Sequence, residues 1–182
     1  MNRTVSIALL AALAIAMWQG YAISSTMSSC LTRAHAIIAD ADTLDRNPPK
    51  NVIAAIVANV GLDKLPSMLA SVLFDRYACR GGANWAGVDW LIERPILIWR
   101  LRSEFDEMEM VAIFAATADL GKGTIGLSNG ARRIYKREIS ELDDRALNCL
   151  LRRPIGKALH RPTPDPVPPI WDCPDEAPRM RS

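Results

Sequence analysis

The chain has few of the residues and spacings on which several large classes of function depend. It contains only two histidines, and its four cysteines follow no zinc-binding pattern, so the sequence predicts no metal site. No motif connects His35 or His160 to a thiol, which argues against a catalytic cysteine. The net charge is only +2 and no cluster of five or more basic residues occurs, so nucleic acid is not expected as a partner.

What is present is the composition of one ordinary globular domain. The chain has 182 residues, of which 49% are hydrophobic and 23% are charged, and that balance is typical of a single folded domain. Proline is unevenly distributed, because seven of the twelve prolines lie in the last 22 residues. The sequence therefore predicts a folded domain over residues 31–160 and an extended, exposed tail over residues 161–182.

The N-terminus has the features of an export signal. Arg3 precedes an apolar run from Val5 to Trp18 that contains no charge, and Gly20-Tyr21-Ala22 offers the small residues that a signal peptidase needs. Extended to Ile23, the run has about 19 residues, enough to cross a hydrocarbon core of ~30 Å as an uncleaved anchor. Residues 1–24 are therefore either a signal peptide or a membrane anchor, and both place the remaining chain outside the cytoplasm.

Disulfides are compatible with an exported chain. The four cysteines allow two bridges and three pairings, between which the sequence does not decide: Cys30, Cys79, Cys149 and Cys173. Leucines surround Cys149 on a predicted helix, so that cysteine is the best candidate for simple burial as a small apolar residue.

Beyond the leader, apolar residues recur at helical spacing almost throughout, which predicts an all-α fold. We expect a central helix from Glu109 to Thr117, packed against a helix from Ser140 to Leu151, because these two segments have the longest apolar faces. Ser140-Glu141-Leu142-Asp143 resembles a capping box at the start of the second helix. Pro95 should make its helix begin or bend near Glu93, because proline costs ~3 kcal/mol inside a helix.

Three glycines between these helices formally match a dinucleotide-binding fingerprint, G-x-G-x-x-G. They are Gly121, Gly123 and Gly126. That fingerprint requires a preceding strand, whereas the residues before Gly121 have helical period and no β-branched run lies nearby. We therefore expect a turn between helices with glycines at positive φ, and no cofactor.

The segment from Glu109 to Pro154 combines a helix, this glycine-rich loop and two more short helices. Leu120–Leu127 is similar to F-G-x-G-x-x-G-V, Ala131–Lys136 to A-A-x-x-Y-F-G-K, and Leu142–Leu147 to L-T-x-x-E-A-A-L-L-A. This order resembles glycosyltransferase family 51, whose members polymerise lipid II into peptidoglycan strands. The resemblance implies a lysozyme-like fold and a peptidoglycan strand or lipid-linked precursor as the partner.

The same resemblance indicates where a catalytic base would lie. In the family a glutamate in E-D-x-x-F-x-x-H-x-G deprotonates the acceptor sugar. Counting back from Gly121 places this motif at Ala36–Asp45, with Ala41 in the position of the glutamate and Asp45 in that of the phenylalanine. Asp40 and Asp42 flank the missing carboxylate and are the candidate catalytic residues; the alternative is that they are capping or solvated carboxylates.

Two further family motifs are also altered. The segment Leu62–Ser67 stands where the family has serine, threonine and glutamine, so Lys64 and Ser67 become the candidates for substrate binding there. The glutamate of R-K-x-x-E falls on Arg94, with Glu93 one position away. Glu93 is a candidate second carboxylate and Arg94 a candidate phosphate ligand, although both also suit a solvated helix face.

Three functions are compatible with this pattern. The first is a protein of the bacterial cell envelope with weak or no catalysis, which binds glycan, a lipid-linked precursor or a cell-wall synthesis protein. The second is an active peptidoglycan glycosyltransferase with a displaced carboxylate base. The third is a lytic enzyme that cleaves glycan, which would require a glutamate with a raised pKa in an apolar cleft. The alanine at position 41 favours the first, at the inner membrane facing the periplasm or free in the periplasm.

Overall fold

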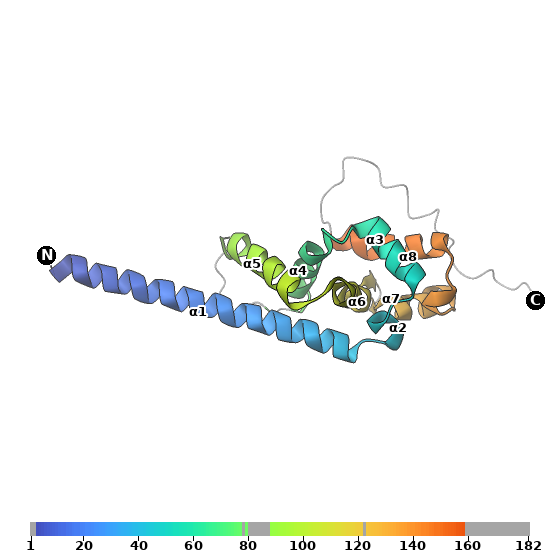
Figure 1. Cartoon of the computed structure of the whole chain (residues 1–182), viewed down its shortest axis with the longest axis horizontal. Helices are drawn as coiled ribbons and strands as arrows, with labels where there is room; N and C mark the ends of the chain where they lie inside the picture. The colour runs from blue at the N-terminus through green and yellow to red at the C-terminus, as the bar shows by residue number, and fades with distance from the viewer. Residues whose placement is uncertain (1–2, 78, 80–87, 122, 159–182) are drawn as a thin grey trace, which may run out of the picture.

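The computed structural model describes residues 3–77, 79, 88–121 and 123–158, and most of them lie in helices, which confirms the predicted all-α class (Figure 1). The predicted tail over residues 161–182 lies outside the described residues. In chain order the elements are α1 (Arg3–Asp40), α2 (Thr43–Arg46), α3 (Lys50–Val60), α4 (Leu65–Asp75), α5 (Val88–Glu104), α6 (Glu107–Thr117), β1 (Asp119–Gly121), β2 (Thr124–Ile125), α7 (Leu127–Gly130), the π-helix η1 (Ala131–Tyr135), the 3-10 helix η2 (Ile139–Glu141) and α8 (Asp144–Ala158).

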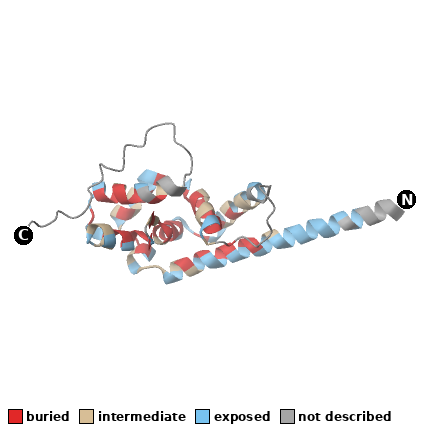
Figure 2. Ribbon diagram, turned by 180° about the vertical axis from the view of Figure 1, so that it is seen from behind, coloured by how far each residue is buried: buried red, intermediate tan, exposed pale blue. Residues whose placement is uncertain are grey.

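Helix α1 has 38 residues and two halves of different character. Its N-terminal half projects beyond the helical body, and large apolar side chains between Leu9 and Tyr21 are exposed there (Figures 1 and 2). From Thr26 and Met27 onward one face of α1 is buried, and this half packs against α5 and α6. Among the described residues no single helix meets the length and hydropathy needed to cross a bilayer, although the bent pair α3 and α4 does so by length and composition.

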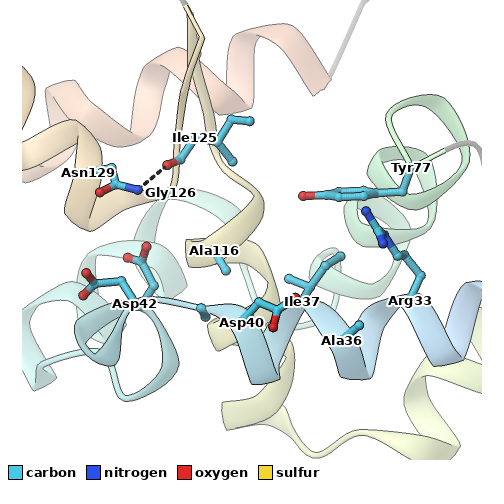
Figure 3. Close-up of a pocket in the computed structure, with 12 residues that line it drawn as sticks. Arg33, Ala36, Ile37, Asp40, Asp42, Tyr77, Ala116, Ile125, Gly126 and Asn129 are labelled. Atoms are coloured by element: carbon cyan, nitrogen blue, oxygen red, sulfur yellow. Dashed lines mark hydrogen bonds between the residues drawn. The ribbon is translucent and has the colours of Figure 1, made fainter.

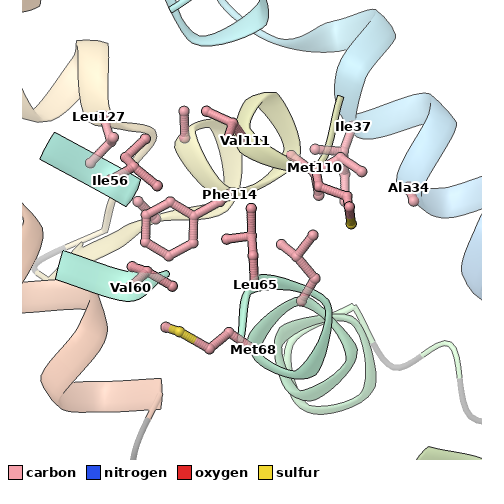
Figure 4. Close-up of a cluster of buried hydrophobic side chains, with 14 of the residues drawn as sticks. Ala34, Ile37, Ile56, Val60, Leu65, Met68, Met110, Val111, Phe114 and Leu127 are labelled. Atoms are coloured by element: carbon pink, nitrogen blue, oxygen red, sulfur yellow. The ribbon is translucent and has the colours of Figure 1, made fainter. Parts of the chain in front are cut away.

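Helix α6 is central, as predicted, and packs against α1, α2, α4 and α7. Its first turn is closed by a capping box, in which Asp106 accepts from the backbone N–H of Glu109 at 2.8 Å and Glu109 accepts from that of Asp106 at 2.9 Å. Apolar side chains cover the rest of the helix, and Figure 4 shows Phe114 of α6 among residues of the neighbouring helices, which include Ile56, Val60, Leu65, Met68 and Leu127.

Helix α8 differs from its prediction in both its start and its neighbours. It begins at Asp144, because Asp143 rather than Ser140 supplies the cap and accepts from the backbone N–H of Ala146 at 2.8 Å. Ser140 instead lies in η2, which has its own capping box between Glu138 and Glu141. α8 packs chiefly against α3 and β1, and α6, its predicted partner, is not among its main neighbours.

Proline at position 95 does not delay the start of its helix. α5 already begins at Val88 and continues past Pro95, whose ring is exposed to solvent. Contacts of α5 with α4 and α1 offset the backbone hydrogen bond that proline cannot donate.

A disulfide fixes the long first helix to the body of the domain. Cys30 on the buried face of α1 is bonded to Cys79, which follows α4. Cys149 is buried in α8, as predicted, but it is also disulfide-bonded, so simple packing was the wrong expectation for its sulfur.

The glycine-rich segment forms a small antiparallel hairpin of β1 and β2 between α6 and α7. The predicted positive φ values are confirmed, at 85° for Gly121, 73° for Gly123 and 88° for Gly126. Because L-residues rarely adopt this backbone conformation, glycine allows the chain to leave α6, reverse and enter α7 within a few residues. The hairpin therefore returns to the C-terminal end of α1.

Candidate functional site

A pocket of about 270 Å³ lies where the C-terminal end of α1 meets the end of the hairpin (Figure 3). The residues that line it come from α1, α2 and the turn between them, the end of α6, the hairpin and α7, together with Tyr77 beyond α4. Three carboxylates from one short stretch of chain form part of this lining: Asp40, Asp42 and Asp45. Ala41, which the sequence resemblance aligned with a glutamate, lines the same pocket.

The chain turns sharply at this acidic stretch because one aspartate ends the first helix and another starts the next. α1 ends at Asp40, and Asp42 caps α2 by accepting from the backbone N–H of Leu44 at 3.0 Å. Asp42 also forms an ion pair with Arg132 of η1. The hydrogen bond from Arg132, followed by that from Leu44, lowers the pKa of Asp42 below its ordinary value, so both contacts favour the ionised form and make Asp42 a weaker base.

Asp45 differs from its neighbours because it is buried, with only 2% of its surface exposed. Its Oδ1 accepts two hydrogen bonds from Ser128 of α7, one from the backbone N–H at 2.9 Å and one from the hydroxyl at 2.7 Å. Burial raises the pKa of Asp45 to about 6; the two Ser128 hydrogen bonds act in the opposite direction, and the nearby Asp42 adds to the rise.

The hairpin closes over Asp45 at a glycine. A Cβ added to Gly126 would lie 2.6 Å from Asp45 Oδ2, so only glycine leaves room for that carboxyl. The next turn of α7 holds Asn129, whose side-chain amide donates to the carbonyl of Ile125 at 3.0 Å (Figure 3). The hairpin and α7 thus add the Asn129 side-chain amide and the backbone at Gly126 to the lining that contains the carboxylates.

The other wall of the pocket combines a cation with an aromatic ring. The Arg33 guanidinium of α1 lies over the Tyr77 ring, with Cζ 5.2 Å from the ring centroid, and Figure 3 shows both side chains at the end of the pocket away from Asp42. The pocket is therefore acidic at one end and aromatic and basic at the other.

The structure brings together only part of the site predicted from sequence. Asp40 and Asp42 line the pocket, whereas the residues of the other two altered motifs do not. Arg94 donates instead to Ser67, at 2.5 Å to the hydroxyl and 3.4 Å to the carbonyl, which joins α5 to α4. Glu93 is half-buried on α5, and Lys64 is exposed at the start of α4.

Four polar side chains of the pocket were not among the predicted site residues: Arg33, Asp45, Tyr77 and Asn129. The resemblance aligned Asp45 with a phenylalanine, and burial of Asp45 was not predicted. An aspartate that aligns with a phenylalanine was the signal that could have identified this residue. A carboxyl in an apolar position must be hydrogen-bonded or protonated.

No match is found when the chain is compared with protein-family models, with curated proteins or with solved structures.

Proposed function

We propose that the chain is an envelope protein similar to glycosyltransferase family 51, which binds a glycan strand or lipid-linked precursor in this pocket and has weak or no transferase activity. One observation carries the proposal. Counting along the sequence assigned Ala41 to the family's base and Gly126 to its glycine-rich loop, and these two residues, 85 positions apart, line one pocket. That proximity supports the alignment from which the function is inferred.

The pocket has groups that suit a carbohydrate. Carboxylates and the Asn129 amide offer hydrogen-bond acceptors and donors for sugar hydroxyls, and Tyr77 offers an aromatic edge or face for the ring carbons. A volume of about 270 Å³ lies near the small end of ligand pockets, roughly 300 Å³, and fits about one sugar ring with the rest of the strand outside.

Weak transfer follows from the carboxylates that replace the missing base. Ala41 supplies no proton acceptor, and Asp42 is held by Arg132 and by the Leu44 N–H, so its basicity is low. Asp40 is exposed at the rim of the pocket. Neither aspartate occupies the position of the family's glutamate.

An envelope location is part of this proposal. The exposed apolar surface of the N-terminal half of α1, which includes Leu13 and Trp18, would be covered by a bilayer or by the export machinery. A reporter that is active only in the cytoplasm, fused to the C-terminus, should be inactive, and an active fusion would contradict export.

The test of function is polymerisation of lipid II by the purified full-length chain. We expect less than roughly a hundredth of the rate of a family member, since loss of a general base typically removes ~100- to 10,000-fold. Ala41→Glu should raise the rate, whereas the matched control Ala41→Gln, which adds similar bulk without a carboxylate, should not.

Binding is measured separately by titration calorimetry with soluble glycan strands. Tyr77→Ala should weaken binding about tenfold, and Asp144→Asn, a change to an exposed carboxylate on α8, should leave it unaltered. The proposed site would be wrong if the unmodified chain polymerises lipid II rapidly. It would also be wrong if Tyr77→Ala binds strands as tightly as the wild type.

A further inference from the structure

The disulfide between α1 and the segment after α4 lies next to one wall of the pocket in the sequence of both segments. Cys30 precedes Arg33 by one turn of α1, and Cys79 follows Tyr77 by two residues. The Arg33 guanidinium lies over the Tyr77 ring, and these two side chains form the end of the pocket away from Asp42 (Figure 3). One covalent bond therefore joins the two segments that supply this wall.

Tyr77 has few other contacts that fix its position. It lies outside the helices, in the bend that follows the end of α4 at Asp75. Among the described residues none forms a hydrogen bond with its side chain, which contacts the Arg33 guanidinium and the edge of the apolar core. A partly exposed cation–π contact is weaker than the conformational entropy lost when several residues are ordered. Tyr77 therefore depends on the bonded, buried Cys79 to stay beside α1.

The two ends of the disulfide are held unequally by the rest of the protein. Cys30 belongs to a long helix that buries further apolar side chains on the same face, among them Leu31 and Ala34. Cys79 follows a bend and belongs to no helix. Loss of the bond should therefore displace Tyr77 more than Arg33.

We propose that this disulfide is a redox switch for the pocket. The oxidised bond holds Tyr77 against Arg33 and completes the carbohydrate site, whereas the reduced chain lacks that wall and binds carbohydrate weakly. The inference rests on the proposed function for the ligand and adds a regulation of the same site. Because disulfides form in oxidising compartments and are rare in the cytoplasm, the chain becomes competent to bind only after export.

The switch requires a disulfide-bearing oxidant as its co-reactant. The thiolate of one cysteine attacks a sulfur of the oxidant, and the other oxidant sulfur leaves as a thiolate. The thiolate of the second cysteine then attacks the sulfur of the first, which forms the Cys30–Cys79 bond and releases the remaining oxidant sulfur. The two cysteines together lose two protons and two electrons, and the oxidant disulfide is reduced to two thiols.

The test uses a full-length chain in which Cys149 and Cys173 are replaced by alanine, so that a phosphine reductant acts on the Cys30–Cys79 bond alone. We expect reduction to weaken binding of glycan strands about tenfold, as Tyr77→Ala does. When Tyr77→Ala is added to this chain, reduction should change binding by less than about twofold, because the wall is already lost. Losses that add in full would mean that the bond acts on the fold as a whole, and the inference would be overturned.

A second measurement does not depend on the glycan. The Tyr77 ring shifts the NMR signals of the Arg33 side chain, and both Tyr77→Ala and reduction should remove that shift while the circular dichroism spectrum stays unchanged. If the wild type binds no strands, the proposed function fails and this measurement alone decides the switch. Arg33 signals that reduction leaves in place, or helices that reduction unfolds, would overturn the switch.

A second variant protects the test against a loss of folding in the chain without Cys149 and Cys173. The combination of Cys30→Ala with Cys79→Ala removes the switch and leaves Cys149 bonded. It should bind strands about tenfold more weakly than the wild type and lack the Arg33 shift without any reductant. Wild-type binding and an unchanged Arg33 shift in this variant would contradict the proposal.

Discussion

Gly126 and Asp45 fit so closely that a single added carbon would bring them into collision, since a Cβ at Gly126 would lie 2.6 Å from Asp45 Oδ2. This contact joins two segments that lie far apart in the sequence: α2, which carries Asp45, and the turn into α7, which is opened by Gly126. The same carboxyl accepts both Ser128 hydrogen bonds, so one buried residue of α2 holds α7 in place directly after the hairpin.

Gly126→Ala should therefore destabilise the domain by more than its backbone strain alone. A non-glycine residue at positive φ costs about 1–3 kcal/mol, and the displaced Asp45 adds to that cost. Gly123→Ala is the matched control, because Gly123 also has positive φ but nothing within 4 Å of its added Cβ. Urea unfolding should show a larger loss for Gly126→Ala, and equal losses would mean that the contact with Asp45 carries no strain.

Asp45→Asn should change how stability depends on pH. The folded-state pKa of Asp45, about 6, lies above its ordinary value of 3.8, so the folded protein binds this proton more tightly than the unfolded chain does. The resulting stabilisation is complete below about 3.8 and is lost as the pH rises through about 6, and two pKa units correspond to about 3 kcal/mol. Asparagine does not ionise, so the variant does not lose this stabilisation as the pH rises.

The measurement is urea unfolding of wild type and Asp45→Asn at about pH 4 and about pH 7.5. The unfolding free energy of the variant minus that of the wild type should be more positive at about pH 7.5 than at about pH 4, by about 2–3 kcal/mol. Asp144→Asn, at an exposed position, should show no such change. A pH-independent difference would mean that Asp45 titrates at its ordinary value.

Local sequence patterns were sufficient for the helices but not for the pocket. Apolar residues at helical spacing identified the all-α class and the central helix α6, because a buried face leaves a periodic signature in the chain. The predicted start of α8 was wrong, since Ser140 and Asp143 both suit a cap and it is Asp143 that accepts from the backbone N–H of Ala146. When two residues suit a cap equally well, the local sequence alone does not tell which of them starts the helix.

Asp45 shows why the site itself was only partly predictable. Its helix α2 has four residues, which is too short for any periodicity to reveal a buried face. Its partner Ser128 lies 83 residues away, and no spacing rule relates the two positions. Asp40 and Asp42 were identified because they lie next to Ala41 in a motif, whereas Tyr77 reaches the pocket only through the path of the folded chain.

Arg132→Gln should release Asp42 and raise its pKa toward the ordinary value. The Arg132 hydrogen bond is the largest cause of the lowered pKa of Asp42, and the remaining bond from Leu44 keeps part of the effect. Carbon-13 NMR of the Asp42 carboxyl during an acid titration measures the change. Arg137→Gln, on an exposed arginine nearby in the sequence, is the control and should leave Asp42 unaltered. An unchanged Asp42 titration in Arg132→Gln would show that the ion pair does not persist in solution.

Removal of the disulfide between α1 and the body should loosen the long helix. The Cys30–Cys79 bond closes a loop with a sequence separation of 49, and the loss of such a cross-link typically costs about 2–4 kcal/mol. Replacement of both cysteines by alanine avoids free thiols and should lower the urea midpoint accordingly. Because α1 ends at Asp40 and leads directly into Ala41, both of which line the pocket, the variant should weaken strand binding as well as stability. If the midpoint falls by less than the equivalent of about 1 kcal/mol, the apolar contacts of Met27, Leu31 and Ala34 are enough to hold α1 in place.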